Sequence, residues 1–331
     1  MKYLLNLTFL IIFFTRLSSQ EIIYPVTNYT TKNYGRDFHP TNRAIVQDLR
    51  GIIYAANGFK LLEFDGSGWK SYPINKETWI LSLAVDSSGI IYAGSQNEFG
   101  LFSPDKRGEL KYKSLSDSLD LEDFNFTNVW KVLSFSGGVV FQAQEKLFLY
   151  KNGEIKVIKP ETSFHTSFVV NDKLYVRQRG IGLMEWNEND LVKIKGSEMF
   201  DTTGIFIMLP FGRNNNNILV GTQEKGFWLF EPGNSTSPFR KFNIEDNNLL
   251  EKANITGGAP TGDGSFAIST MLNGVIVLDT AGKTKAIINN RNGLIGNDVK
   301  QLLSDQSQNL WLALENGIIR IEINSPLSTF T

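Results

Sequence analysis

The sequence offers few side chains that could perform catalytic chemistry. It has two histidines, His39 and His165, and no cysteine. The missing cysteine excludes disulfides, thiolate catalysis and Cys-ligated zinc or iron–sulfur sites. A Ser–His–Asp triad would have to use one of these histidines without a G-x-S-x-G motif, and neither a P-loop nor a G-x-G-x-x-G motif is present. We therefore predict no enzyme activity, no catalytic residue, no cofactor and no metal site.

Carboxylate pairs exist, for example at 114–124, where Asp120, Glu122 and Asp123 follow one another closely. Their spacing is not that of a calcium loop, D-x-[DN]-x-[DN]-G. They are best explained as a solvated connection that could contain one helical turn.

Recognition of a ligand is the chemistry that the sequence favours. Aromatic, amide, Arg and carboxylate side chains recur at two positions of a repeated unit: the segment leading into its first strand, and the loop between its second and third strands. Such side chains together bind sugars, since aromatic faces cover C–H surfaces and polar groups bond hydroxyls, and binding sites combine apolar walls with a few polar groups. The candidate ligand-binding residues are Asn42, Arg43, Trp79, Asn97, Glu98, Asn128, Trp130, His165, Arg177, Arg179, Phe206 and Asp298.

Structural roles compete with this interpretation at every candidate. Polar residues occur in all loops, and inward aromatic residues can simply pack between repeats. Glu98 belongs to the phrase QNEFG, which looks like part of the repeat itself, and His165 could be a loop or core histidine. Trp79, Trp130 and Arg43 occupy the best positions.

The repeated unit determines the predicted fold. The phrase IVQDLRGIIYAANGFKLLEFD (45–65) recurs as LAVDSSGIIYAGSQNEFGLFSPD (83–105) and LLSDQSQNLWLALENGIIRIEIN (302–324). Each copy is an apolar strand, a polar turn, a second strand and a short turn into a third, and copies of about 40–50 residues are typical of propeller blades. We predict an all-β, seven-bladed β-propeller of four-stranded antiparallel blades over 41–331, and no helix-period segment after the leader. The blades span about 42–74, 79–115, 128–158, 165–194, 205–244, 254–288 and 299–331.

Residues 1–20 have the pattern of a secretory signal peptide. Lys2 precedes the apolar run 3–14, and Ser18 and Ser19 follow it. The run is shorter than the ~20 residues that a spanning helix needs. We expect cleavage near Ser19 or Gln20 and export to a periplasm, with an uncleaved anchor as the alternative.

The seventh repeat ends without a fourth strand. The chain stops shortly after its third strand, whereas a closed ring needs a complete last blade. The lead-in segment 21–40 could donate that strand, or the natural protein could continue. We expect continuation beyond residue 331.

The net charge is −1, from 33 basic and 34 acidic residues. This balance gives no electrostatic reason to expect direct contact with nucleic acid or an anionic membrane.

Three passages resemble the two-component regulator propeller repeats, which form the sensor region of large bacterial membrane regulators. They are AIVQDLRGIIYAANGFKLLEFDGSGWKSYPI (44–74), IYAGSQNEFGLFSPD (91–105) and NRNGLIGNDVKQLLSDQSQNLWLALENGIIRIEINSP (290–326). The resemblance spans 40–331 and is weakest in blades three to six. It implies periplasmic propellers followed by a triple-tyrosine β-sandwich, a transmembrane helix, and a histidine kinase or LuxR-type output. Such regulators act as homodimers, and many sense carbohydrates.

The sequence thus predicts a periplasmic ligand-sensing propeller of a membrane-spanning, transcription-regulating protein. We expect a small-molecule or oligosaccharide ligand, a homodimer in the full-length regulator, and membrane attachment only through a segment after residue 331. A propeller enzyme acting on polysaccharide and a protein-interaction scaffold are the alternatives; fold alone does not exclude them.

Overall fold

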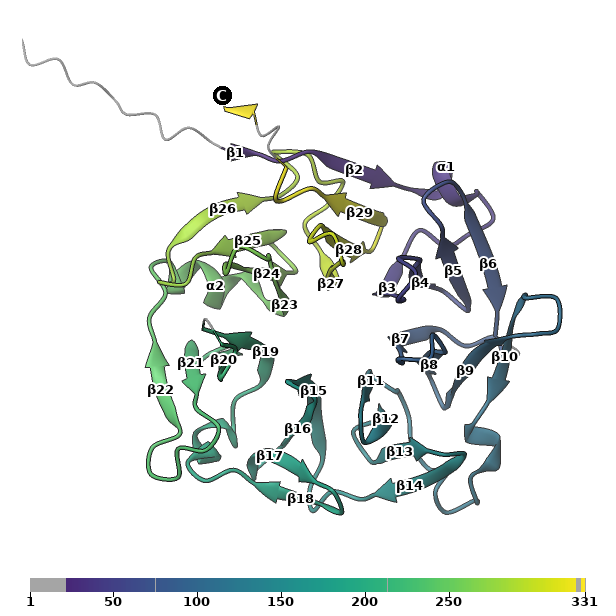
Figure 1. Ribbon diagram of the computed structural model, residues 1–331, viewed down its shortest axis with the longest axis horizontal. Helices are drawn as coiled ribbons and strands as arrows, with labels where there is room; N and C mark the ends of the chain where they lie inside the picture. Colours follow the sequence, from purple (N-terminus) through teal and green to yellow (C-terminus); the bar gives the residue numbers. More distant parts are fainter. Residues whose placement is uncertain (1–21, 75, 213, 326–328, 331) are drawn as a thin grey trace, which may run out of the picture.

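The computed structural model describes residues 22–74, 76–212, 214–325 and 329–330. They form seven four-stranded antiparallel sheets arranged around a central axis (Figure 1), which confirms the predicted seven-bladed propeller. The predicted signal peptide, 1–20, lies outside the described residues. None of the helices in the described ranges is long and apolar enough to cross a membrane.

Each blade begins at the axis and ends at the rim. Blade 1 consists of β3 (Asn42–Gln47), β4 (Ile53–Asn57), β5 (Lys60–Phe64) and β6 (Trp69–Pro73). Blade 2 consists of β7 (Ile80–Val85), β8 (Ile91–Ser95), β9 (Glu98–Pro104) and β10 (Leu110–Ser114). Blade 3 consists of β11 (Lys131–Phe135), β12 (Gly138–Gln142), β13 (Leu147–Lys151) and β14 (Glu154–Ile158). Blade 4 consists of β15 (Phe164–Val170), β16 (Lys173–Gln178), β17 (Gly182–Asn187) and β18 (Asp190–Lys193).

The remaining blades follow the same order. Blade 5 consists of β19 (Ile205–Phe211), β20 (Asn217–Thr222), β21 (Phe227–Phe230) and β22 (Phe239–Phe242). Blade 6 consists of β23 (Ile255–Pro260), β24 (Phe266–Thr270), β25 (Val275–Leu278) and β26 (Thr284–Ile288). Blade 7 consists of β27 (Val299–Ser304), β28 (Leu310–Leu314), β29 (Gly317–Ile321) and β2 (Val26–Tyr29). A further pair, β1 (Ile22–Ile23) and β30 (Thr329–Phe330), lies outside the blades.

Short helices occupy some connections, although no segment after the leader has a helical period in the sequence. They are α1 (Thr31–Tyr34), α2 (Asn247–Ala253) and the 3-10 turns η1 (Ser116–Ser118) and η2 (Ser197–Phe200). The helix α2 has only seven residues, too few to establish a helical period in the sequence. The turn η1 lies in the segment 114–124, for which the sequence suggested one helical turn.

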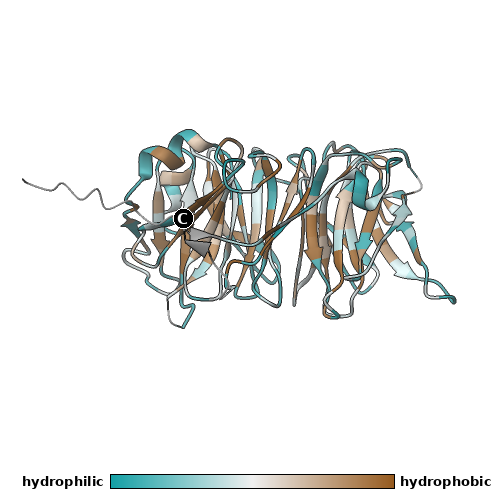
Figure 2. Cartoon of the chain, turned by 90° about the horizontal axis from the view of Figure 1, so that it is seen from above, coloured by the Kyte–Doolittle hydropathy of each residue, from teal (hydrophilic) through white to brown (hydrophobic). Residues whose placement is uncertain are grey.

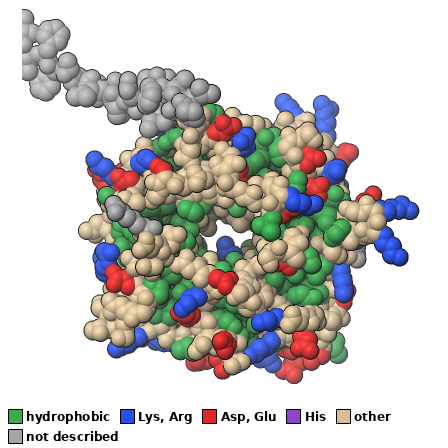
Figure 3. All heavy atoms as spheres, viewed as in Figure 1, with side chains coloured by type: hydrophobic (Ala, Val, Ile, Leu, Met, Phe, Trp, Pro, Cys, Tyr) green, Lys and Arg blue, Asp and Glu red, His purple; other side chains and the backbone are tan. Residues whose placement is uncertain are grey.

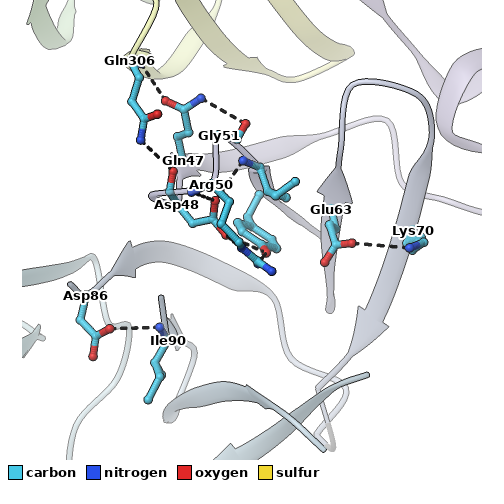
Figure 4. Close-up of polar contacts among 11 residues, drawn as sticks. Gln47, Asp48, Arg50, Gly51, Glu63, Lys70, Asp86, Ile90 and Gln306 are labelled. Atoms are coloured by element: carbon cyan, nitrogen blue, oxygen red, sulfur yellow. Dashed lines mark hydrogen bonds and ion pairs between the residues drawn. The ribbon is translucent and has the colours of Figure 1, made fainter. Parts of the chain in front are cut away.

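An aspartate stabilises the turn between the first two strands of several blades. Asp86 Oδ1 accepts the backbone N–H groups of Ser88 (2.9 Å) and Ile90 (3.0 Å), and its Oδ2 accepts the Tyr92 hydroxyl at 3.0 Å. Such Asp side chains bond the backbone of their own turn and so set the hairpin geometry. Figure 4 shows the Asp86 turn beside the equivalent Asp48 turn of blade 1.

Apolar side chains fill the spaces between adjacent blades. The second strands β4, β8, β24 and β28 are buried along their whole length, so each blade packs both faces against neighbours. Figure 2 shows the hydrophobic strands between two faces of more hydrophilic loops. Small residues such as Ala55, Ala93 and Ala313 in these strands let the blades approach.

The N-terminal lead-in closes the ring. The strand β2 pairs antiparallel with β29, from Val26 opposite Ile321 to Tyr29 opposite Ile318, and is the fourth strand of blade 7. The sequence allowed two sources for this strand, the lead-in segment or chain beyond residue 331, and favoured the second. In the structure the strand comes from the lead-in segment. The predicted boundary near residue 40 is therefore corrected, because residues 26–29 belong to the propeller.

Aromatic side chains reinforce this closure. Tyr29 stacks on Trp311 of β28 with ring centroids 5.8 Å apart and planes 10° apart. Tyr29 also meets Phe64 and Trp69 of blade 1, at 5.3 and 5.6 Å. The closing strand thereby contacts both blade 7 and blade 1. We call the junction between these two blades the seam.

We expect Trp311→Ala to destabilise the protein by about 3–5 kcal/mol, because it empties a buried site at the seam. The substitution also removes the indole N–H that donates to Asp305 Oδ2 at 2.9 Å. Urea unfolding followed by circular dichroism measures this as a lower midpoint. Leu49→Ala, at a side chain that is 69% exposed, is the control and should change stability by less than about 0.5 kcal/mol. Equal midpoints for the two variants would contradict a stabilising role for the seam.

Candidate functional site

A cavity of about 700 Å³ lies on the propeller axis and is lined by residues of all seven innermost strands. The space-filling view shows an opening at the centre of the face (Figure 3). Apolar side chains dominate the wall, and a small set of polar and charged groups interrupts it. This combination is usual for a ligand site.

One side chain per blade is directed into the cavity by an irregularity near the start of the innermost strand. In six of these strands the pairing with the second strand shifts register there; in blade 2, Ile80 pairs with Ser95 and Ser82 with Gly94, so Leu81 is the extra residue. Such β-bulges bend a strand and redirect a side chain. In blade 3, the Trp130 backbone N–H donates to Gln142 O, and Lys131 is also paired with Gln142. Two consecutive residues thus face one, and Trp130 is the extra residue.

We call these seven residues the bulge ring, and all of them line the cavity. In blade order they are Arg43, Leu81, Trp130, His165, Phe206, Thr256 and Lys300.

The bulge arises where the chain passes from one blade to the next. The residue just before the bulge donates its backbone N–H to the preceding blade: Ile80 to Gly58 O (2.8 Å), Val129 to Ser95 O (3.0 Å) and Phe164 to Gln144 O (2.9 Å). The next residues pair within their own blade. One residue lies between the two pairings, and its side chain lines the axial cavity.

The bulge ring has two chemically different parts. The aromatic arc, on blades 3 to 5, consists of Trp130, His165 and Phe206. Trp130 is 41% exposed, and the His165 and Phe206 rings meet edge to face with centroids 5.5 Å apart. The cationic arc, on blades 7 and 1, consists of Lys300 and Arg43. Lys131, next to Trp130, adds a third cation to the cavity wall.

The three cations differ in their partners. Lys300 forms ion pairs with Asp298 (2.7 Å) and Glu315 (3.3 Å). The Arg43 guanidinium lies 5.3 Å from the Trp79 ring centroid, and its Nε is buried without a hydrogen-bond partner. Within the described ranges, neither Arg43 nor Lys131 has a carboxylate partner, and burial lowers the pKa of Lys131.

His165 is neutral at physiological pH. Burial and the positive charges of Arg177 and Arg179 lower the pKa of His165 to about 4. Its Nδ1 is buried and has no hydrogen-bond partner in the described part of the chain. The ring can therefore serve as a neutral polar and aromatic contact for a ligand.

Four of the twelve candidates line the cavity together: Arg43, Trp130, His165 and Phe206. Trp79 and Asp298 do not line it but contact the cations that do, Arg43 and Lys300 respectively.

Three candidates are buried in structural hydrogen bonds. Glu98 is fully buried and accepts bonds from Tyr112 (2.8 Å), Ser116 (2.9 Å) and Lys76. Arg177 Nε donates to Phe200 O at 3.0 Å, and the Asn42 side-chain oxygen accepts from Asn57 at 3.0 Å.

The other three candidates lie on loops outside the cavity lining. Asn97 and Arg179 are exposed, and Asn128 is half-buried beside Gln96 of the neighbouring blade.

Sequence reasoning missed Lys131, Lys300, Leu81 and Thr256 as lining residues. A positional signal was present, because Arg43, Leu81 and Lys300 each stand five residues before the turn aspartates Asp48, Asp86 and Asp305. The bulged residue thus stands five positions before the turn aspartate. In the clearest repeats, this offset could have predicted which residue lines the cavity.

No protein-family model and no curated protein matches this chain. Solved structures share its fold. The extracellular domain of the one-component system BT4673 from B. thetaiotaomicron superposes with a TM-score of 0.69 at 18% identity, over 91% of this chain and 40% of that one. The extracellular domain of the hybrid two-component system BT3049 from the same organism gives 0.67 at 19% identity, over 92% and 42%. The chain thus spans about 40% of the length of these domains.

A propeller enzyme also shares the fold. Virginiamycin B lyase from Staphylococcus aureus superposes with a TM-score of 0.68 at 12% identity, over 91% of this chain and 99% of the lyase. At such identities the likeness establishes the fold. In the ranges that the structure describes, no group of three or more His, Asp or Glu side chains is placed to hold a metal ion.

We expect Glu98→Ala to destabilise the protein by about 3–5 kcal/mol, because the buried Tyr112 hydroxyl and the Lys76 ammonium lose their acceptor. Urea unfolding measures the loss. Glu109→Ala in the same blade is the matched control, since Glu109 pairs with Lys111 at the exposed surface and should contribute less than about 1 kcal/mol. Equal stability of the two variants would show that the buried network is not structural.

His165 should titrate near pH 4 in the folded protein. In a His39→Gln variant it is the only remaining histidine, so NMR of its ring resonances follows it without overlap. Because the unfolded chain takes up this proton near pH 6.5 and the folded chain only near pH 4, stability should fall as the pH drops through that window. Arg179→Gln should raise the pKa of His165. A midpoint near 6.5 in the folded protein would contradict the buried, positively surrounded environment.

Proposed function

We propose that this chain is an exported ligand-sensing propeller of a bacterial membrane regulator and that its bulge ring binds a saccharide. The observation that carries the proposal is the aromatic arc, which presents Trp130, His165 and Phe206 to an open axial cavity. Flat aromatic faces beside polar groups suit the C–H faces and hydroxyls of a sugar.

Two independent resemblances support the sensor role. The end repeats resemble those of two-component regulator propellers, and the extracellular domains of BT4673 and BT3049 share the fold. The sensor role, the export and a homodimeric regulator with kinase or DNA-binding output are the parts of the proposal that these resemblances suggest.

A propeller enzyme is less well supported. The cavity wall carries His165 as its sole histidine and no carboxylate among the described lining residues. General acid–base catalysis needs a positioned proton donor and acceptor with pKa values near the working pH. A neutral histidine whose pKa is about 4 is poorly suited to that task.

Sensing requires that the ligand favour one arrangement of the regulator over another. The bulge ring draws one residue from each blade, and a ligand there lies at the exposed centre of one face. We propose that the bound ligand alters the contacts of this face with a second chain, because the packed blades leave little room for internal change.

A thermal-shift screen of mono- and oligosaccharides tests the saccharide proposal. A sugar that binds only the folded state should raise Tm in a saturable way, corresponding to about 2.7 kcal/mol at 100-fold excess over Kd. Trp130→Ala should weaken binding at least about tenfold, since covering ~60 Å² of apolar surface contributes about 1.4 kcal/mol.

Val192→Ala is the matched control, because Val192 is 52% exposed on β18 and does not line the cavity. It should leave the shift unchanged. A folded protein that no saccharide stabilises, or a shift that survives Trp130→Ala, would overturn binding at the bulge ring.

A further inference from the structure

We infer that the ligand of the bulge ring is an acidic saccharide, whose carboxylate or sulfate group is bound by Arg43 and Lys131. The inference rests on the proposed function and specifies its ligand class. It follows from the positive charges of the cavity wall and from the side-chain donors there that have no partner within the protein.

The charged groups of the wall all have one sign. Its described lining residues include Arg43, Lys131 and Lys300 and no Asp or Glu. The whole chain is almost neutral, with a net charge of −1, so this is a local segregation of charge. A cavity with apolar walls and one sign of charge concentrates ions of the opposite sign.

Only Lys300 among the three cations forms ion pairs, although the positive charge of Arg43 also contributes to lowering the pKa of Glu315. Asp298 and Glu315 both pair with Lys300, so Lys300 has little capacity left for a ligand. Elsewhere, the half-buried or buried lysines that reach between loops also have partners: Lys76 pairs with Glu98 and Asp117, and Lys146 pairs with Asp123. Arg43 and Lys131 make no such ion pair within the described ranges.

Arg43 has the geometry of an anion receptor. Its guanidinium lies over Trp79, which limits the positions that the side chain can take. Its Nε is buried without a partner, and leaving such a donor unpaired is costly. A guanidinium fork binds carboxylate or sulfate through two parallel hydrogen bonds.

Lys131 places a second positive charge beside the aromatic arc. It directly follows Trp130, and both line the cavity. Its ammonium makes no ion pair in the described structure. Burial lowers its pKa by disfavouring the charged form, and an anion bound nearby would stabilise that form. Leu81 of blade 2 lies between Arg43 and Trp130 in the ring.

The wall therefore presents an aromatic face, an apolar residue and two unpaired cations over three adjacent blades. A sugar ring stacked on Trp130 with an acidic substituent directed toward Arg43 and Lys131 matches this order. A neutral sugar would leave both cations without a directly bound anion, whereas a free inorganic anion would leave the aromatic arc unused.

Calorimetric titration of the whole protein with matched saccharides tests the inference. The probes are digalacturonate, galactobiose sulfate, neutral galactobiose and sodium sulfate. We expect at least one acidic disaccharide to bind tenfold or more tightly than galactobiose, with an affinity that falls as salt is raised. Which of the two acids binds more tightly distinguishes a carboxylate site from a sulfate site.

Two charge variants and one control localise the effect. Arg43→Gln and Lys131→Met should each lower the affinity for the acidic disaccharide toward the affinity for galactobiose. Arg43→Lys keeps the charge but not the fork and should be intermediate. Arg291→Gln removes an exposed arginine that does not line the cavity and should change nothing. Melting curves without ligand verify that every variant is folded.

The remaining outcomes overturn the inference in distinguishable ways. Equal affinity for acidic and neutral disaccharides, unaffected by Arg43→Gln, would refute the acidic ligand and leave the saccharide proposal intact. Binding of sulfate alone, equally in wild type and Arg43→Gln, would mean an adventitious ion only. A folded protein that binds none of the saccharides would overturn both proposals.

Discussion

Closure of the ring is the constraint on which the rest of the structure depends. One short strand, β2, pairs with β29 from the far end of the described sequence and completes blade 7, which lies against blade 1. Bonds across the seam then follow, from Thr41 to Glu315 (2.9 Å) and from Ile45 N–H to Gln301 (3.1 Å). The cationic arc straddles this seam, since Lys300 and Arg43 lie on blades 7 and 1. The axial cavity and its charges therefore exist only in the closed ring.

The sequence predicted the blades because their stabilising contacts are local. A turn aspartate and the Tyr or Trp six residues later, as in Asp86 and Tyr92 or Asp305 and Trp311, form one hairpin and repeat visibly. The closing strand could not be predicted in this way. Its four residues, 26–29, have no repeat pattern, and their partner is almost the whole chain away. Nothing local distinguishes such a strand from an extended lead-in.

The candidate site was predictable in its chemistry and less so in its membership. Arg43, Trp130, His165 and Phe206 were recognisable from residue type and position, and the cavity does bring them together. Glu98 and Arg177 have the same kinds of side chain, but each is used within the blade. Whether such a side chain lines the cavity or bonds within its blade depends on whether it occupies the bulged position of an innermost strand. Lys300 was missed although it stands five residues before its turn aspartate, and Lys131 was missed because it lies one position after the bulged residue Trp130.

The β-bulges also have an evolutionary consequence. A bulged residue lies outside the ladder of paired residues, so its side chain takes no part in setting how the strands pair. The seven positions therefore form a variable set on a constant frame, in which Leu81 or Thr256 could be exchanged for a charged or aromatic residue at small cost to folding. A duplicated gene with this architecture could acquire a different ligand through a few substitutions near the axis. Descendants would keep the same outline while their binding chemistry diverged.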